Sequence, residues 1–245
     1  MRRARVKCSY LRMPWDFWLI FLFLAVVIPW RGHARLKRLL EMPAVSEREK
    51  INLYVVTIAF QWVLAVVVAW RAFARGLTLQ QLRLGHTDLE TVLGFGVVGA
   101  AFVAGLHWLN LRRIGKSQLP AAEALRTLAS RLMPRSEAER IPYFGLAITA
   151  GVCEEFVYRG FAMASVERIG VPGVGAVFLV AILFGLAHAY QGRGGIFGTM
   201  ILGILFGFIT LTCSSVIPVM IWHAAVDTVA GIAGPKYLLA GRNAA

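Results

Sequence analysis

Long apolar stretches alternate with short charged segments along the 245 residues of this chain. Each stretch comes close to the ~20 residues that an α-helix needs to cross the hydrocarbon core of a bilayer. The pattern predicts an all-α fold, a polytopic membrane helix bundle with about seven transmembrane helices. The predicted helices cover roughly residues 15–30, 51–70, 91–111, 142–165, 172–190, 195–212 and 214–233.

The segment 112–141 contains a further helix of a different kind. Its stretch "AAEALRTLASRL" alternates apolar and polar residues at helical spacing, which is typical of a helix lying on a membrane surface. An interfacial or re-entrant helix of this kind would raise the number to eight. Lys and Arg are divided almost evenly between the two faces, so the positive-inside rule leaves the orientation open.

Composition supports the membrane assignment. Hydrophobic residues make up 58% of the chain and charged residues 16%, with a mean hydropathy of +0.65, whereas soluble domains carry about 25% charged residues. Several tryptophans fall near predicted helix ends, as an aromatic belt requires. We expect an integral, multi-pass protein of the cell (plasma) membrane of a prokaryote. The tryptophans near helix ends are Trp15, Trp18, Trp30, Trp70 and Trp108.

The net charge of +13 comes from basic segments between the apolar stretches, such as "MRRARVKCSYLR" and "RGHARLKR". Basic loops beside membrane spans indicate contact with anionic lipids. The chain contains no nucleic-acid module, so the expected partners are membrane lipids and not nucleic acid. The three cysteines, Cys8, Cys153 and Cys213, have no zinc-site spacing, and Cys153 is better explained as a packing residue than as a nucleophile.

Ionisable residues inside the last four predicted helices indicate chemistry. Three acidic residues fall well inside these helices, namely Glu154, Glu155 and Asp227, and two histidines, His188 and His223, accompany them. Charged groups inside a membrane are costly and are kept mainly where they pair or react. Polar groups that converge inside a helix bundle therefore usually mark a functional site.

The spacing predicts two pairs. Glu155 and Arg159 are four residues apart on one helix face and can form an ion pair, and His223 and Asp227 share a face in the same way. Glu154 points about 100° away from Glu155 and lacks that partner. Three possibilities remain open for it: protonation, a polar partner on another helix (His188 or the His223/Asp227 pair), or a metal.

Helix rise gives approximate depths for these residues. At ~1.5 Å per residue, Glu154 lies about 18 Å and His223 about 16 Å from the same face of a ~30 Å core. His188 comes out at only about 3 Å from that face. The first two depths agree, whereas His188 requires a tilted or displaced fifth helix.

Three ordered motifs resemble a known protease family. "EEFVYR" fits Glu-Glu-x-x-x-Arg, "FGLAH" (Phe184 to His188) fits Phe-x-x-x-His, and "HAAVD" fits His-x-x-x-Asn/Asp. The chain resembles the CPBP family of intramembrane proteases, also called the CAAX protease and bacteriocin-processing or Abi family, to which the Ras-converting CAAX endopeptidases belong. The resemblance covers residues ~142–233. It implies an N-terminal three-helix membrane region with basic loops (1–141), a four-helix catalytic core (142–233) and a C-terminal tail (234–245).

The resemblance also implies roles for these residues. Glu154 and His188 would activate a water that attacks the scissile carbonyl group, and His223 and Asp227 would stabilise the oxyanion. Glu155 and Arg159 would hold the helix geometry, and Phe184 would be a supporting residue.

Asp227 departs from the family pattern, because many relatives have Asn there. An amide can donate to an oxyanion and an ionised carboxylate cannot. Asp227 would therefore be protonated, orient His223, or ligate a metal.

The resemblance leaves the metal open as well. Glu154, His188, His223 and Asp227 would suit Zn²⁺ as ligands, yet the metal-free glutamate mechanism fits the same residues. We favour the mechanism without a cofactor.

The sequence therefore predicts an intramembrane endopeptidase that cleaves a membrane-tethered or lipidated protein or peptide near its terminus. The alternative is a non-catalytic membrane scaffold or immunity-type protein that keeps the buried polar residues for packing. A transporter is a weaker option, because no inverted repeat is visible.

Overall fold

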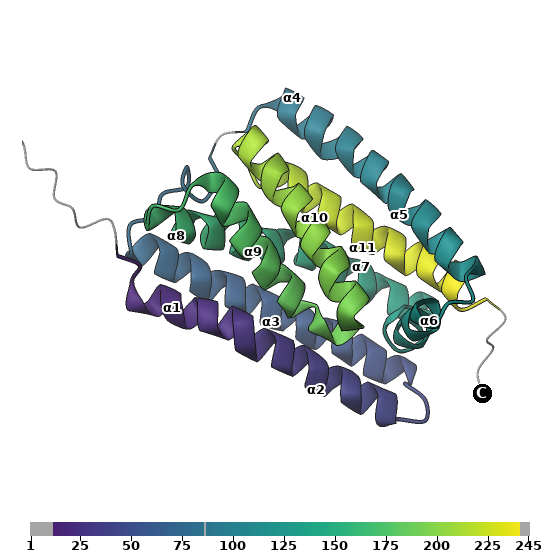
Figure 1. Cartoon of the computed structure of the whole chain (residues 1–245). Coiled ribbons are helices and arrows are strands. Elements are labelled where there is room, and N and C mark those ends of the chain that lie inside the picture. The colour runs from purple at the N-terminus through teal and green to yellow at the C-terminus, as the bar shows by residue number, and fades with distance from the viewer. Residues whose placement is uncertain (1–11, 86, 241–245) are drawn as a thin grey trace, which may run out of the picture.

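A computed structural model describes residues 12–85 and 87–240. Within these ranges the chain is helical and has no strand, which confirms the predicted all-α class. Figure 1 shows the helices packed side by side as a bundle. In chain order the elements are α1 (Trp15–Leu22), η1 (Phe23–Val27), α2 (Ile28–Glu41), α3 (Glu47–Ala74), α4 (Leu89–Thr91), η2 (Val92–Val98), α5 (Gly99–Lys116), α6 (Pro120–Leu132), α7 (Glu137–Glu155), η3 (Phe156–Ala162), α8 (Met163–Arg168), α9 (Gly173–Ala187), η4 (Ala189–Gln191), α10 (Gly192–Cys213) and α11 (Ile217–Leu238).

Each of the seven predicted stretches is helical, and the amphipathic segment forms α6. Five helices in the described part of the chain are long and apolar enough to cross a membrane. The predicted fourth helix, within 137–168, is not among them. The predicted fifth helix, α9, is apolar but has only 15 residues. The five long helices are Trp15–Glu41, Glu47–Ala74, Leu89–Lys116, Ala189–Cys213 and Ile217–Leu238.

The helix α7 lies between α3 and α11 and carries the two adjacent glutamates. Its alignment with α3 is fixed near its start, where the buried Lys50 of α3 donates to a Glu139 carboxylate oxygen at 3.3 Å. One turn further on, the rings of Tyr54 and Tyr143 meet edge to face with centroids 5.4 Å apart. These two contacts set which residues of α3 face the later turns of α7.

Close backbone approach fixes the alignment of α7 with α11. A Cβ atom at Gly151 would lie 2.7 Å from the Met220 carbonyl oxygen and 2.9 Å from the Ala224 nitrogen. Only glycine, which lacks a side chain, permits this separation. The contact lies one turn before the glutamates, so it brings them against α11.

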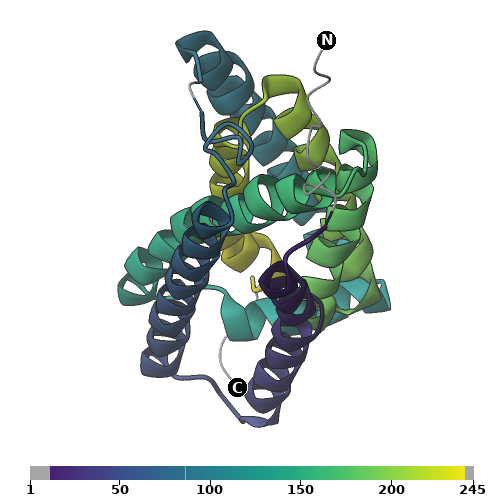
Figure 2. The same ribbon diagram turned by 90° about the vertical axis from the view of Figure 1, so that its left-hand side faces the viewer.

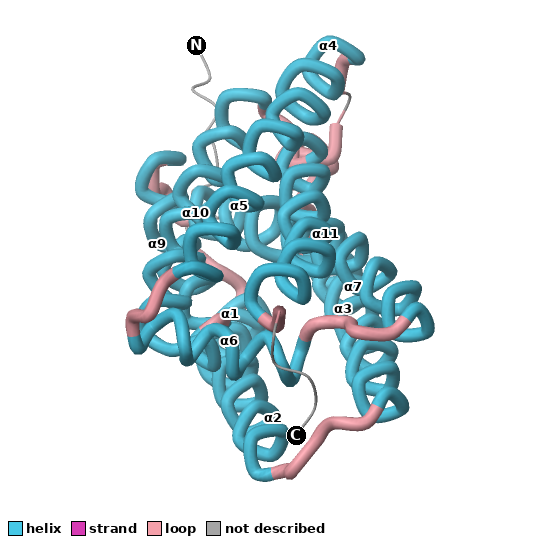
Figure 3. The backbone as a smooth tube through the Cα atoms, turned by 90° about the vertical axis from the view of Figure 1, so that its right-hand side faces the viewer, coloured by secondary structure: helices cyan, strands magenta, loops and turns pink. Residues whose placement is uncertain are grey.

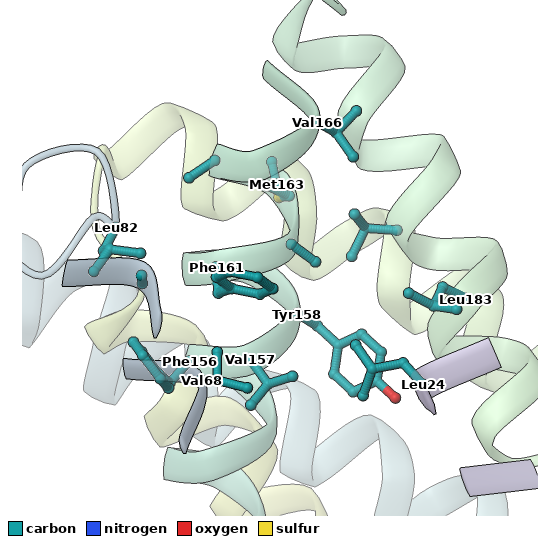
Figure 4. Close-up of a cluster of buried hydrophobic side chains, with 14 of the residues drawn as sticks. Leu24, Val68, Leu82, Phe156, Val157, Tyr158, Phe161, Met163, Val166 and Leu183 are labelled. Atoms are coloured by element: carbon teal, nitrogen blue, oxygen red, sulfur yellow. The ribbon is translucent and has the colours of Figure 1, made fainter. Parts of the chain in front are cut away.

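A π-helical segment, η3, follows the glutamates directly and is buried along its whole length. Its side chains pack against Leu24 of η1, Val68 of α3 and Leu183 of α9, as Figure 4 shows. Such a segment packed on all sides by apolar side chains is held rigidly. Short π-helical turns occur frequently at functional sites, and this one contains Arg159.

The helix α9 ends earlier than predicted. We expected it to continue to residue 190, but its last helical residue is Ala187, and the 3₁₀ turn η4 leads straight into α10. At 15 residues it measures about 22 Å, less than the ~30 Å core. Its C-terminal end, and with it His188, therefore stops short of the far side of a core of that thickness.

The first helix is longer than predicted, because α1, η1 and α2 continue without a break from Trp15 to Glu41. Its end diverges from α3, and the loop 42–46 spans the separation, as Figures 2 and 3 both show. The helix α2 still reaches the polar part of the bundle, since a Cβ atom at Gly32 would lie 3.1 Å from the ring of Tyr190 in η4.

Candidate active site

The carboxylate of Glu155 is fully buried at the end of α7 and bonds two side chains, those of Arg159 and His223. Arg159 donates to its Oε1 atom at 2.8 Å, and Nδ1 of His223 lies 2.7 Å from the same atom. The predicted Glu155–Arg159 pair is thus observed, and it includes a histidine from α11 that the spacing alone did not assign to it. Shared between two donors, this carboxylate joins α7, η3 and α11.

Aromatic rings cover the guanidinium group of Arg159. Its Cζ atom lies 4.3 Å from the ring centroid of Phe184 and 5.5 Å from that of Phe206. Cation–π contacts of this kind stabilise a desolvated guanidinium group. Gly203 of α10 makes room, since a Cβ atom there would lie 3.4 Å from Nη2 of Arg159.

Phe184, predicted as a supporting residue, lies at the centre of these groups. Its ring centroid is 4.7 Å from that of His188 and 6.1 Å from that of His223. One ring therefore contacts both histidines and also covers Arg159. This position explains physically why a large aromatic residue precedes His188 by one helical turn.

His223 lies between the carboxylates of Glu155 and Asp227, and this arrangement restricts the protonation states that it can have. Nδ1 donates to Glu155, and Nε2 lies 3.6 Å from Oδ2 of Asp227. A neutral imidazole that donates through Nδ1 presents a lone pair at Nε2, which a second carboxylate would repel. A proton must therefore lie on Nε2 or on Asp227.

Glu154 is partly exposed, unlike its neighbour Glu155. Its Oε1 atom accepts a hydrogen bond from Nε2 of Gln61 at 2.7 Å. We expected its partner among His188, His223 and Asp227, and the bonded partner instead comes from α3. The sequence does carry a signal, because Gln61 stands alone in the apolar run "TIAFQWVLAVV", but no spacing rule connects it to Glu154.

His188 is the C-terminal cap residue of α9, and its Nδ1 donates to the Phe184 carbonyl oxygen at 2.9 Å. In the neutral imidazole this leaves a lone pair on Nε2, where a proton can be accepted.

These side chains form two layers. Glu155, Arg159 and His223 are buried, whereas Glu154, His188 and Asp227 are partly exposed. Tyr190, directly after this histidine in "HAYQG", also belongs to the outer layer, with its ring centroid 6.0 Å from that of His188. Our sequence analysis missed Tyr190 and Gln61. The inner layer can hold the geometry while the outer layer meets a ligand.

The zinc alternative was tested against the donor geometry. Across residues 12–85 and 87–240, no group of three or more His, Cys, Asp or Glu side chains is arranged to hold a metal ion. One of the four candidate ligands also has another partner, since Nδ1 of His223 is bonded to Glu155. The side-chain arrangement of the described residues does not fit a three-ligand site. Cys153 is buried and has no bonded cysteine partner, and Cys8 lies outside the described residues.

Fold and site together define the class of protein: an integral membrane helix bundle with a carboxylate–imidazole centre between its helices. Residues 137–229 match the family model described as Type II CAAX prenyl endopeptidase Rce1-like. The match is to a family of CAAX-type intramembrane proteases, and it confirms the resemblance that the three motifs indicate. Comparison with curated proteins gave no match, and neither did comparison with solved structures.

Proposed function

We propose that this protein is an intramembrane endopeptidase that hydrolyses a membrane-tethered or lipidated protein or peptide near its terminus. The observation that carries the proposal is that two adjacent glutamates differ in burial and in hydrogen-bond partners. Glu155 is buried and bonded to Arg159 and His223, while Glu154 is partly exposed and has one neutral partner, Gln61. Packing of the helices requires the buried carboxylate of Glu155. It does not require a second carboxylate, that of Glu154, at a partly exposed position.

In the proposed reaction Glu154 and His188 activate a water molecule. Glu154 takes one proton from the water, and the oxygen bonds to the scissile carbonyl carbon, which gives a tetrahedral intermediate. Nε2 of His188 can accept a hydrogen bond from the same water, because Nδ1 is occupied by the Phe184 carbonyl oxygen. When the carbon–nitrogen bond breaks, the proton on Glu154 passes to the leaving amine.

His223 and Asp227 stabilise the oxyanion in this proposal. A proton on Nε2 of His223, between two carboxylates, gives a donor aimed towards the partly exposed side of the site. Fixed donors of this kind contribute about 2.7–4 kcal/mol to transition-state stabilisation in hydrolases. The aspartate, which replaces the more usual asparagine, acts by holding this proton in place.

The surroundings are consistent with a lipid-embedded substrate. Five long apolar helices and many outward-facing apolar side chains place the centre in a membrane protein. A substrate tethered to the same membrane reaches such a centre by lateral diffusion. Location in the plasma membrane of a prokaryote belongs to this proposal as well.

The test is a comparison of protein termini in cells that carry wild-type protein, Glu154→Gln or Glu47→Gln at equal abundance. Glu47→Gln is the matched control, because Glu47 is exposed in the first turn of α3. We expect new termini with wild type and with the control, and none with Glu154→Gln. Identical termini in all three, together with rescue of a deletion phenotype by Glu154→Gln, would establish a non-catalytic scaffold instead.

A further inference from the structure

We propose that Gln61 of α3 is a positioning residue that fixes the carboxylate of Glu154 for catalysis. This inference rests on the proposed function. Gln61 lies outside the segment 137–229 that matches the protease family. The N-terminal part of the chain would therefore complete the site as well as surround it.

The contact itself is direct. Nε2 of Gln61 lies 2.7 Å from Oε1 of Glu154, a distance typical of a hydrogen bond to an ionised acceptor. It is the one bonded partner of the Glu154 side chain among the described residues. Without this contact, the exposed carboxylate could rotate about its side-chain torsions, and a general base must stay within hydrogen-bond reach of its proton.

The position of Gln61 is determined by the packing of α3 on α7. Lys50 and Tyr54 of α3 contact Glu139 and Tyr143 of α7, as described above. The Lys50 amino group also donates to the Met133 carbonyl oxygen at 3.0 Å, which ties α3 to the loop before α7. These contacts leave Gln61, further along α3, beside the last turn of α7.

A role in packing alone explains Gln61 poorly. Its Oε1 atom is buried and has no hydrogen-bond partner, and an unsatisfied polar atom in an apolar setting is destabilising. An apolar residue of similar size would avoid that cost and pack equally well against the surrounding helices. The amide is therefore explained by what its NH₂ group does, which is to hold Glu154.

The experiment compares Gln61→Met and Gln61→Asn with a matched control, Val63→Met. Methionine keeps the length of the side chain and removes the donor, and asparagine keeps the amide but is too short to reach Glu154. Val63 is on the same helix and 64% exposed. Because asparagine is polar, it provides the test if the methionine variant does not fold.

Turnover is measured on the full chain in lipid bilayers, with a peptide that spans the cut site identified by the comparison of termini. We expect kcat to fall about tenfold to a hundredfold in both Gln61 variants, which is the factor that a hydrogen bond to an ionised group contributes. KM should change less than twofold, and Val63→Met should behave as wild type. A kcat equal to that of the control, or a change confined to KM, would overturn the positioning role.

A second measurement does not depend on catalysis. The infrared difference between wild type and Glu154→Gln isolates the carboxyl bands of Glu154, and the same difference is recorded in the Gln61→Met background. We expect the bands to shift when the amide donor is lost, and unshifted bands would overturn the inference. If wild type cleaves nothing but the bands shift, the proposed function fails while the contact between the two side chains stands.

Discussion

Nδ1 of His223 and Oε1 of Glu155 lie 2.7 Å apart, although the two residues are 68 positions apart in the sequence. The contact links the ends of two elements that pack through a glycine, α7 and α11. Arg159 donates to the same oxygen atom. A single buried carboxylate thereby sets the orientation of a histidine whose other nitrogen lies 3.6 Å from the partly exposed Asp227.

Removal of Arg159 should destabilise the whole centre. In Arg159→Ala the Glu155 carboxylate stays buried with only His223 as partner, and loss of one member of a buried ion pair costs roughly 3–5 kcal/mol. We expect a clear fall in the midpoint of thermal unfolding in detergent. Arg48→Ala is the control, since Arg48 is exposed in the first turn of α3. Equal unfolding midpoints for both variants would show that the pair does not stabilise the fold.

The close contact between α7 and α11 should not tolerate a methyl group. In Gly151→Ala the added Cβ would meet backbone atoms of α11 at less than 3 Å, so the helices must move apart. We expect a loss of about 1–3 kcal/mol in the free energy of unfolding, together with reduced turnover, because Glu154 and Glu155 move with α7.

Gly145 on the same helix provides the matched control for this prediction. A Cβ atom there would meet only a side-chain methyl group of Ile58 at 3.7 Å. Gly145→Ala should be neutral, or more stable by about 0.5–1 kcal/mol, because alanine favours a helix interior. If both variants behaved alike, the helix separation at Gly151 would not be what places the site.

Two substitutions at position 227 distinguish the roles open to Asp227. Asparagine can still accept a hydrogen bond from Nε2 of His223 through its Oδ1 atom, and its NH₂ group can donate to an oxyanion. Asp227→Asn should therefore keep kcat/KM within about tenfold of wild type. Leucine offers no polar group, and Asp227→Leu should lose about a hundredfold or more, the range found when an oxyanion donor is removed. Equal losses in the two variants would mean that the negative charge itself is required, through its effect on the Nε2 proton of His223.

Chelation tests the metal question. Because the four candidate ligands lack the arrangement of a three-ligand site among the described residues, we expect peptidase activity to survive incubation with a chelator. Metal analysis of the purified protein should show zinc well below one equivalent. Near-stoichiometric zinc, with activity lost on chelation and restored by added Zn²⁺, would assign Glu154, His188, His223 and Asp227 as ligands after all.

Features that depend on residues close together in the chain are predictable from the sequence. Apolar runs near the length of a bilayer core predicted the helices, and four-residue spacing predicted the Glu155–Arg159 pair, which the structure shows at 2.8 Å. The three ordered motifs gave the protease family, which the match over residues 137–229 confirms. Each of these signals lies within one helix or in the order of neighbouring helices.

Side-chain contacts between helices that are far apart in the sequence became known from the three-dimensional structure. It gave Glu155 a second partner in His223, and it gave Glu154 a partner in Gln61, 93 positions away on α3. It also ended α9 at Ala187, so that His188 is the cap residue of this helix. The physical reason is that helix periodicity fixes which residues share a face, whereas the relative register of two helices depends on contacts such as those at Gly151 and Lys50, which no pattern within either helix records.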